Sequence, residues 1–283
     1  MERIKEALAR ARAEREAQAS LQPGQPATIA AGAVTSRTLR RTTPPVTEVK
    51  VNYSKTATVP VDPIHLRDKR IILTKEQSAV ADAYKVLRTH VLQRMRANGW
   101  KALAVTSPMD GNGKTLTAIN LAISLAQDVN QTVLLVDLDL RRPTLGRYLW
   151  GSPTRGISDY LTDGADLGDL LIHPGIERLT VLPGNNSFTQ SSEMLSSPRM
   201  IQLVQDLKTR YENRLTLFDM PPLLTSDDVL AFLPNLDAVM LVIEDGKTTR
   251  DQLDQAYRLL GDKNIIGTVL NKSAEASSAA GYY

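Results

Sequence analysis

One nine-residue run, Ser107 to Thr115, constrains the fold of this 283-residue chain more than any other feature. The run ends in Gly111-Asn112-Gly113-Lys114-Thr115, a strand-like apolar segment precedes it, and a helical pattern follows it. Glycines in such a loop let backbone N–H groups turn toward an oligophosphate at the positive end of the following helix. The lysine adds charge for the outer phosphates, and the threonine hydroxyl is a ligand for Mg²⁺. The segment therefore predicts a nucleotide-phosphate site between a strand and a helix.

This loop departs from the usual phosphate-binding pattern at two places. Pro108 stands where the first glycine is normally found, and Asp110 adds a negative charge that is unfavourable unless its side chain turns outward. Asn271, at the end of the last expected strand, is a candidate contact for the adenine ring. The predicted ATP-binding residues are Asp110, Gly111, Asn112, Gly113, Lys114, Thr115, Leu116 and Asn271.

Two further apolar runs end in carboxylates. Residues 132–137 lead to Asp137 and Asp139, and residues 215–218 lead to Asp219. In an open parallel sheet, ligands bind outside the carboxyl ends of the strands, so all three acids are expected to converge on the phosphate loop. One such Asp alone is explained better as a helix or turn cap. Three together indicate a site for a metal ion and water.

Strand-like and helical patterns alternate along most of the chain. This alternation predicts an α/β fold of three layers, in which helices cover both faces of a mainly parallel sheet, as in P-loop NTPases. The expected strands are residues 102–106, 132–137, 179–182, 214–219, 237–243 and 265–270, and the expected helices are 75–97, 113–128 and 191–211, short helices up to about 174, and 248–260.

The segment Asp137-Leu138-Asp139-Leu140-Arg141-Arg142-Pro143 resembles a signature of the bacterial tyrosine kinases (BY-kinases), the cytoplasmic autokinases of exopolysaccharide and capsule assembly. The Arg-Arg-Pro ending is its discriminating part. Other agreeing segments follow in order, namely 156–162, 182–184, 192–197, 218–222, 237–242 and 266–271. The resemblance spans about residues 75 to 272 and implies a fold like that of the deviant Walker ATPases.

The resemblance implies roles for these residues in ATP-dependent phosphoryl transfer. Lys114, Asp137 and Asp139 are the candidate catalytic residues, and Asp137 is the better candidate to accept the proton of a tyrosine hydroxyl. Which of the two acids has which role is left open. The implied cofactors are ATP and Mg²⁺, with Thr115, Asp139 and Asp219 as metal ligands directly or through water.

Composition divides the chain into four parts. Residues 1–20 read as a short helical arm, 21–69 as a disordered linker rich in Pro and Thr, 70–272 as the kinase domain, and 273–283 as a flexible tail. The tail ends in Tyr282 and Tyr283, which resemble the carboxyl-terminal tyrosines that the family autophosphorylates. A leash of this length favours transfer to a neighbouring subunit.

A helical series of charges, Asp82, Lys85 and Arg88, resembles the motif through which these kinases form rings. A solvated helix face explains the series almost as well, because Asp and Lys replace the Glu and Arg of that motif. The resemblance also implies a membrane-spanning chain-length regulator as a partner, and a cognate tyrosine phosphatase.

The basic charge lies outside the expected domain. The first 60 residues carry ten Lys or Arg and five Asp or Glu, so this arm is +5 in a chain of net charge +3. Nucleic acid is therefore not an expected partner. The arm suits an anionic membrane surface or an acidic partner, and a solvated tail without a specific target explains its charge as well. No stretch of 18 apolar residues occurs, so a cytoplasmic chain recruited peripherally to the inner membrane is expected. The chain has no cysteine and its histidines lack ligand spacing, which excludes a structural zinc site.

Two other functions remain open for this fold. Partitioning and positioning ATPases of the ParA and MinD kind use water as the phosphate acceptor, but they carry a second lysine early in the loop, and residues 107–110 contain none. A docking subunit of the export machinery that binds nucleotide without turnover is the other alternative.

Overall fold

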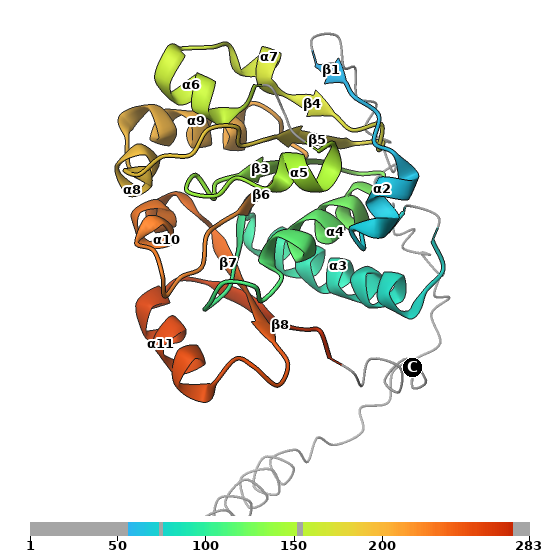
Figure 1. Ribbon diagram of the computed structural model, residues 1–283, viewed down its shortest axis with the longest axis vertical. Helices are drawn as coiled ribbons and strands as arrows, with labels where there is room; N and C mark the ends of the chain where they lie inside the picture. Colours follow the sequence, from blue (N-terminus) through green and yellow to red (C-terminus); the bar gives the residue numbers. More distant parts are fainter. Residues whose placement is uncertain (1–55, 74–75, 152–154, 274–283) are drawn as a thin grey trace, which may run out of the picture. The chain divides into compact units, whose positions relative to one another are not determined.

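The computed structural model describes residues 56–73, 76–151 and 155–273. They form one eight-stranded sheet in the order β1-β4-β5-β3-β6-β2-β7-β8, in which every pair is parallel except β4 with β5 (Figure 1). The strands are β1 Ala57–Thr58, β2 Ala102–Thr106, β3 Thr132–Asp137, β4 Ile172–His173, β5 Leu179–Leu182, β6 Arg214–Asp219, β7 Ala238–Glu244 and β8 Ile265–Asn271. The predicted α/β fold with a mainly parallel sheet is confirmed.

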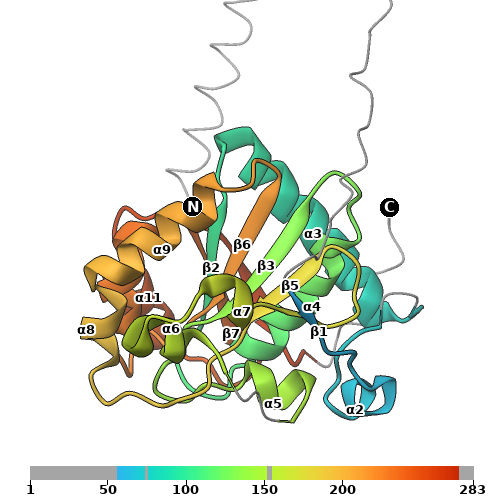
Figure 2. The same ribbon diagram turned by 90° about the horizontal axis from the view of Figure 1, so that it is seen from above.

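Helices cover both faces of the sheet, as Figure 2 shows from above. The described helices are α2 Pro63–Asp68, α3 Ala79–Asn98, α4 Lys114–Ala126, α5 Leu145–Leu149, α6 Ile157–Asp163, α7 Leu167–Leu170, α8 Ser191–Leu195, α9 Pro198–Thr209, α10 Asp228–Phe232, the 3₁₀ turn η1 Leu233–Asn235, and α11 Arg250–Leu260. Helices α2 to α5 pack on one face, and α6 to α11 on the other. None of the helices in this described part of the chain is long and apolar enough to cross a membrane.

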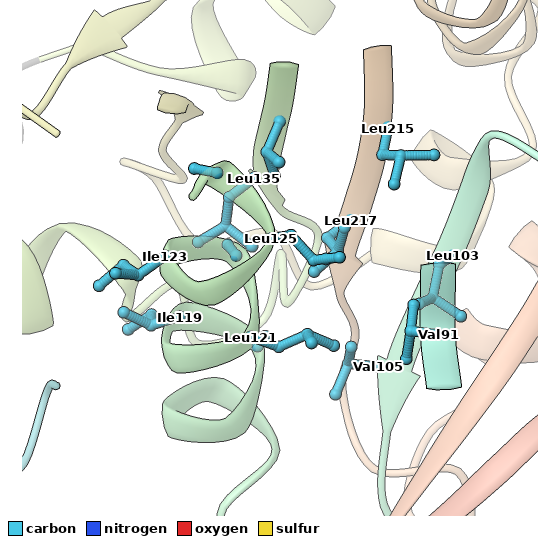
Figure 3. Packing of buried hydrophobic residues seen from close by; sticks show 14 of the residues in the cluster. Val91, Leu103, Val105, Ile119, Leu121, Ile123, Leu125, Leu135, Leu215 and Leu217 are labelled. Carbon is cyan, nitrogen blue, oxygen red and sulfur yellow. The ribbon is translucent and has the colours of Figure 1, made fainter. Parts of the chain in front are cut away.

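Alternating side chains of the central strands build two separate cores. Leu103 and Val105 of β2 join the core under α3 and α4, whereas Ala102 and Ala104 of the same strand face the opposite core. Successive side chains of a strand point to opposite faces, so a strand buried on both faces is apolar throughout. Figure 3 shows leucines and isoleucines of α4 beside the sheet residues of the first core. Helix α4, which follows the phosphate loop, is thereby anchored along its length.

The register of the central strands brings the predicted acids together. Asp137 of β3 is the direct partner of Asp219 in β6, and Asp219 also pairs with Val105 of β2. Strand β2 leads into the phosphate loop, so the loop and both carboxylates meet at the same edge of the sheet.

The segment expected as linker contains secondary structure. Part of the segment expected as linker, 21–69, contains β1 and α2, and α2 buries Leu66 in the first core. Asp62 caps α2 by accepting a hydrogen bond from the backbone of Ile64, and Pro63 occupies the first turn. This prediction was wrong for residues 56–69, because one buried leucine and one cap are too weak a pattern to detect in a Pro-rich sequence.

One expected helix is two helices. The predicted helix 191–211 is interrupted after α8, and α9 begins afresh at Pro198 with Ser197 as its cap. A proline at the first helical position preceded by serine is a start signal, which the apolar periodicity of this segment concealed.

Candidate active site

Gly113 and strand β8 determine the conformation of the phosphate loop. Gly113 has φ 93°, and a Cβ at this position would overlap the side-chain amide nitrogen of Asn271. That amide donates a hydrogen bond to the backbone carbonyl of Asn112, 2.9 Å away. Glycine is required here for conformation and for space. Asn271 therefore contacts the backbone of the phosphate loop in this structure. Its predicted contact with adenine stays a prediction.

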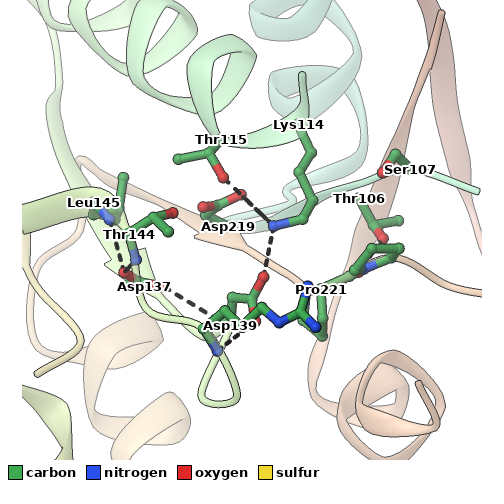
Figure 4. Close-up of polar contacts among 12 residues, drawn as sticks. Thr106, Ser107, Lys114, Thr115, Asp137, Asp139, Thr144, Leu145, Asp219 and Pro221 are labelled. Atoms are coloured by element: carbon green, nitrogen blue, oxygen red, sulfur yellow. Dashed lines mark hydrogen bonds and ion pairs between the residues drawn. The ribbon is translucent and has the colours of Figure 1, made fainter. Parts of the chain in front are cut away.

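Lys114 is the cation at the centre of the candidate site (Figure 4). Its Nζ donates to Oδ2 of Asp139 at 2.8 Å and lies 4.0 Å from Oδ1 of Asp219. Burial alone would lower the pKa of the lysine, but the charges of Asp219 and Asp139 outweigh burial and raise it. Lys114 is therefore firmly protonated and is the counter-charge for a cluster of carboxylates.

Asp137 is fully buried and is oriented by backbone N–H groups. Its Oδ2 accepts from the N–H of Thr144 and of Leu145, each at 2.9 Å, and its Oδ1 accepts from the N–H of Asp139 at 3.2 Å (Figure 4). Burial and the neighbouring Asp219 raise the pKa of Asp137 to about 7, against the opposing hydrogen bond from Leu145. A carboxyl with a pKa near neutrality is suited to exchange protons.

The carboxylate of Asp219 is suited to bind a cation. It is fully buried, and neither carboxylate oxygen accepts a close hydrogen bond within the described residues. Burial raises its pKa to about 6, while the Lys114 charge and the Thr115 hydroxyl oppose that rise. Buried polar atoms are normally hydrogen-bonded, so these oxygens point to a missing ligand.

The site fits Mg²⁺ better than a metal that needs a full protein cage. Among the described residues, no three His, Cys, Asp or Glu side chains form a metal-binding group. Asp139, Asp219 and the Thr115 hydroxyl would supply only part of a coordination shell. Mg²⁺ usually takes one or two carboxylates and completes its shell with water and substrate phosphates.

Asp110 differs from the rest of the phosphate loop in its exposure. Asp110 is exposed, whereas Asn112 and the two residues after Gly113 are buried and Leu116 is partly buried. The expected effect of its charge on bound phosphates stays a prediction.

Residues at the ends of β7 and β8 support the loop and were not predicted. Lys272 donates to the carbonyl of Gly111 at 2.8 Å and pairs with Glu244 at 3.1 Å. The side chain of Asn112 also reaches Glu244, at 3.4 Å. Glu244 ends a buried strand, as Asp137 and Asp219 do, so the same reasoning from strand ends would have identified it.

The Arg-Arg-Pro segment is tied to the helices beside it through Arg141. Its Nε donates to Ser191 Oγ at 2.8 Å, and its Nη2 pairs with Asp227 and Asp228 at 3.1 and 3.3 Å. Asp228 is fully buried and also accepts from Ser191 Oγ at 2.8 Å. This network anchors the segment that follows Asp139.

The other predicted residues lie away from this cluster. Asp82 and Lys85 form an exposed ion pair of 2.7 Å on α3, while Arg88 donates to the carbonyl of Ser124 and to Gln127 of the same chain. Their role in an oligomer stays a prediction. Tyr282 and Tyr283 lie outside the described residues.

Comparisons with known proteins identify the family of the chain. A family model described as "AAA domain" matches residues 100–261. The chain is 30% identical over 216 residues to tyrosine-protein kinase YwqD of Bacillus subtilis, covering 75% of this chain and 90% of that protein. It is 27% identical to succinoglycan biosynthesis transport protein ExoP of Rhizobium meliloti, covering 73% of this chain and 27% of that protein.

The fold agrees as well. The crystal structure of the VpsO kinase domain matches with a TM-score of 0.60 and 30% identity, covering 69% of this chain and 94% of that chain. Since a tyrosine-protein kinase and a solved kinase domain are each similar to this chain over most of their own length, the chain belongs to the bacterial tyrosine kinase family.

Proposed function

We propose that this chain is an ATP-dependent protein-tyrosine kinase that phosphorylates tyrosines of its own carboxyl-terminal tail. One observation carries the proposal: a phosphate loop, a buried lysine and three carboxylates meet at the carboxyl ends of β2, β3 and β6. A kinase needs positioning and charge neutralisation more than covalent chemistry, and this cluster supplies both.

Each residue of the cluster has a distinct part in the proposed reaction. The backbone N–H groups of residues 111–115 hold the α- and β-phosphates, and Lys114 exchanges Asp139 for the β- and γ-phosphate oxygens when ATP binds. Asp137 accepts the proton of the tyrosine hydroxyl. Its raised pKa supports this role, because a base with a pKa near the working pH is efficient.

Thr115, Asp139 and Asp219 would hold Mg²⁺, directly or through water. The buried carboxylate of Asp219, which accepts no close hydrogen bond among the described residues, and the adjacent hydroxyl support this choice. A bound Mg²⁺ would neutralise charge on the transferring phosphoryl group. Its charge would also offset the repulsion among the buried carboxylates, which outnumber the single lysine.

We propose Tyr282 and Tyr283 as the acceptors, with transfer between neighbouring subunits of a ring in which Asp82, Lys85 and Arg88 contribute to the interface. Transfer within one chain is the competing arrangement. Lys272 lies beside Gly111, and ten extended residues span up to about 33 Å. Mixing a Lys114→Met chain with a chain lacking both tyrosines distinguishes them, because only transfer between chains restores phosphate to the Lys114→Met tail.

We also propose a setting for the kinase. It docks on the cytoplasmic side of a membrane-spanning chain-length regulator, and its phosphorylation cycle regulates exopolysaccharide polymerisation or export, with a cognate phosphatase resetting the cycle. The basic arm of residues 1–60 supports recruitment to an anionic membrane surface. The similarity to ExoP, a transport protein of succinoglycan biosynthesis by name, supports the link to polysaccharide.

Intact mass of the purified chain incubated with Mg·ATP tests the kinase, alone and with a fragment of the candidate regulator. The expected result is a gain of one or two phosphates that is lost in Lys114→Met and in the Tyr282→Phe/Tyr283→Phe variant. Release of inorganic phosphate without a mass gain would instead assign the chain to the ATPase switches. Nucleotide binding without turnover, even with the regulator fragment, would assign it to the docking subunits.

A further inference from the structure

A basic pocket lies beside the candidate catalytic acids. It has a volume of about 290 Å³, and its walls include Arg141, Arg142 and Arg147 on one side and Gly184 and Asn185 on the other. Three arginines occur within residues 141–147 and no acidic residue does. The pocket is therefore a local concentration of positive charge in a domain that has no basic excess.

Two of these arginines are available to bind a ligand. Arg141 is engaged by Ser191, Asp227 and Asp228. Arg142 and Arg147 are exposed, and within the described residues their guanidinium groups make no hydrogen bond or ion pair. A guanidinium presents a planar set of donors that matches carboxylate and phosphate oxygens. Two such groups on one pocket are suited to an anionic ligand.

The backbone that carries the pocket also holds the candidate catalytic acids. The N–H of Arg142 donates to Oδ1 of Asp139 at 3.1 Å, and the N–H of Thr144 donates to Oδ2 of Asp137. Across the pocket, a Cβ on Gly184 would lie 3.2 Å from Cγ of Asp137 and 2.5 Å from Cβ of Pro143. Gly184 and residues 143–144 thus line the pocket and also lie against the carboxyl group of the proposed proton acceptor.

The phosphate loop contributes nothing to this pocket. None of residues 107–116 lines it, and the loop reaches the acids through Lys114, which contacts Asp139. An anion in the pocket is therefore bound outside the phosphate loop.

We propose that this pocket is an acceptor subsite, in which Arg142 and Arg147 bind an anionic group next to the tyrosine that is being phosphorylated. The inference rests on the proposed kinase function. The anion is a carboxylate of an acidic neighbour or the phosphate of a tyrosine already modified. The subsite makes the kinase select tyrosines in anionic sequence surroundings and makes one modified tyrosine promote modification of the next.

Steady-state kinetics of the full chain tests the subsite with three short peptides of equal length. One carries Glu beside the acceptor tyrosine, the second carries Gln, and the third carries phosphotyrosine. Arg142→Gln and Arg147→Gln are the variants, alone and combined. Arg210→Gln is the matched control, because Arg210 is exposed and caps α9 at the opposite end of the strands.

We expect the Glu or the phosphotyrosine peptide to have a KM about tenfold below that of the Gln peptide, an effect typical of two charge-assisted contacts. The double variant removes that preference, the Arg210→Gln chain keeps it, and the KM for ATP is unchanged throughout. The preference also shrinks as salt increases. Whichever peptide is preferred identifies the source of the anion.

Two results overturn the subsite. One is the same peptide preference in the double variant as in the parent, and the other is a rise in the KM for ATP without a change in peptide preference. If the parent phosphorylates no peptide and no tail, the kinase proposal fails separately. Anisotropy of the labelled peptides bound to the Lys114→Met chain then tests the pocket alone, with unchanged affinity in the double variant as the refuting result.

Discussion

Replacing Asp219 with asparagine is expected to stabilise the unliganded protein at pH 8 while abolishing phosphoryl transfer. Asp219 is fully buried, and its pKa is raised from 3.8 to about 6, chiefly by burial. A carboxyl whose folded pKa is raised favours the folded state only while it is protonated. Its contribution is therefore complete below about pH 4 and is lost as the pH rises through about 6.

The size of the effect follows from the change in pKa. A rise from 3.8 to about 6 corresponds to about 3 kcal/mol of destabilisation at pH 8, since each pKa unit is about 1.4 kcal/mol. A buried amide without a good partner forfeits about 1 kcal/mol of this gain. The net expectation is about 2 kcal/mol, or an increase in Tm of about 4 to 8 °C for a domain of this size.

Thermal unfolding at pH 8 and pH 5 measures this effect, with and without Mg·ATP. The stability gained by Asp219→Asn is expected to be large at pH 8 and small at pH 5, where the wild-type carboxyl is largely protonated. Mg·ATP is expected to stabilise the parent and not the variant, because the variant lacks a metal ligand.

Asp237→Asn is a control variant that is expected to change the stability in the opposite direction. Burial raises the pKa of Asp237, but hydrogen bonds from Lys208, Lys101 and Ala102 outweigh burial and lower it. The control variant is therefore expected to lose stability at pH 8. The reasoning is refuted if Asp219→Asn destabilises the unliganded protein at pH 8, or if its effect is the same at both pH values.

Three further predictions follow from the same cluster. Lys114→Met is expected to reduce the free energy of unfolding by about 3 kcal/mol at pH 8, because it leaves buried carboxylates unpaired, and by less at pH 5; urea denaturation at both pH values checks this. Gly113→Ala is expected to abolish ATP binding in a calorimetric titration, whereas adding Asn271→Ala recovers part of the lost stability by relieving the overlap. If Asp137 is the base, kcat/KM for a peptide acceptor rises with pH and levels off above about 7, and a flat profile from pH 5 to 9 contradicts that role.

The site was largely predictable because its residues stand at the ends of strands. Runs of apolar residues long enough to be buried on both faces predicted β3 and β6, and parallel strands place their carboxyl ends at one edge. Asp137 and Asp219 follow from that rule, and the structure pairs them directly. Neither the spacing nor the rule carries information about which atom each carboxylate contacts.

Features that depend on single contacts were not predictable. Leu66 is the only residue of α2 that is buried, so no periodic pattern distinguishes this helix from a linker. The Arg88 side chain is partly buried and reaches Ser124 in α4 and Gln127 at its C-terminal end. Such pairings depend on how two helices pack, and a helical charge series alone is compatible with a solvated face, an internal contact or an interface.

Asp137 and Asp139 stand two residues apart, yet the structure gives them different chemistry. Asp139 follows the end of β3 and reaches Lys114, so its charge is matched by a cation and by the N–H of Arg142. Asp137 is the last residue of β3 and faces Asp219 across the ladder, so its charge is opposed by a carboxylate. A buried acid opposed by a like charge takes up a proton readily, which is the property that a general base needs. We therefore keep Asp137 as the proposed base and Asp139 as a proposed ligand, and the pH profile of an Asp139→Asn variant, which retains Asp137, should keep its rise near neutrality.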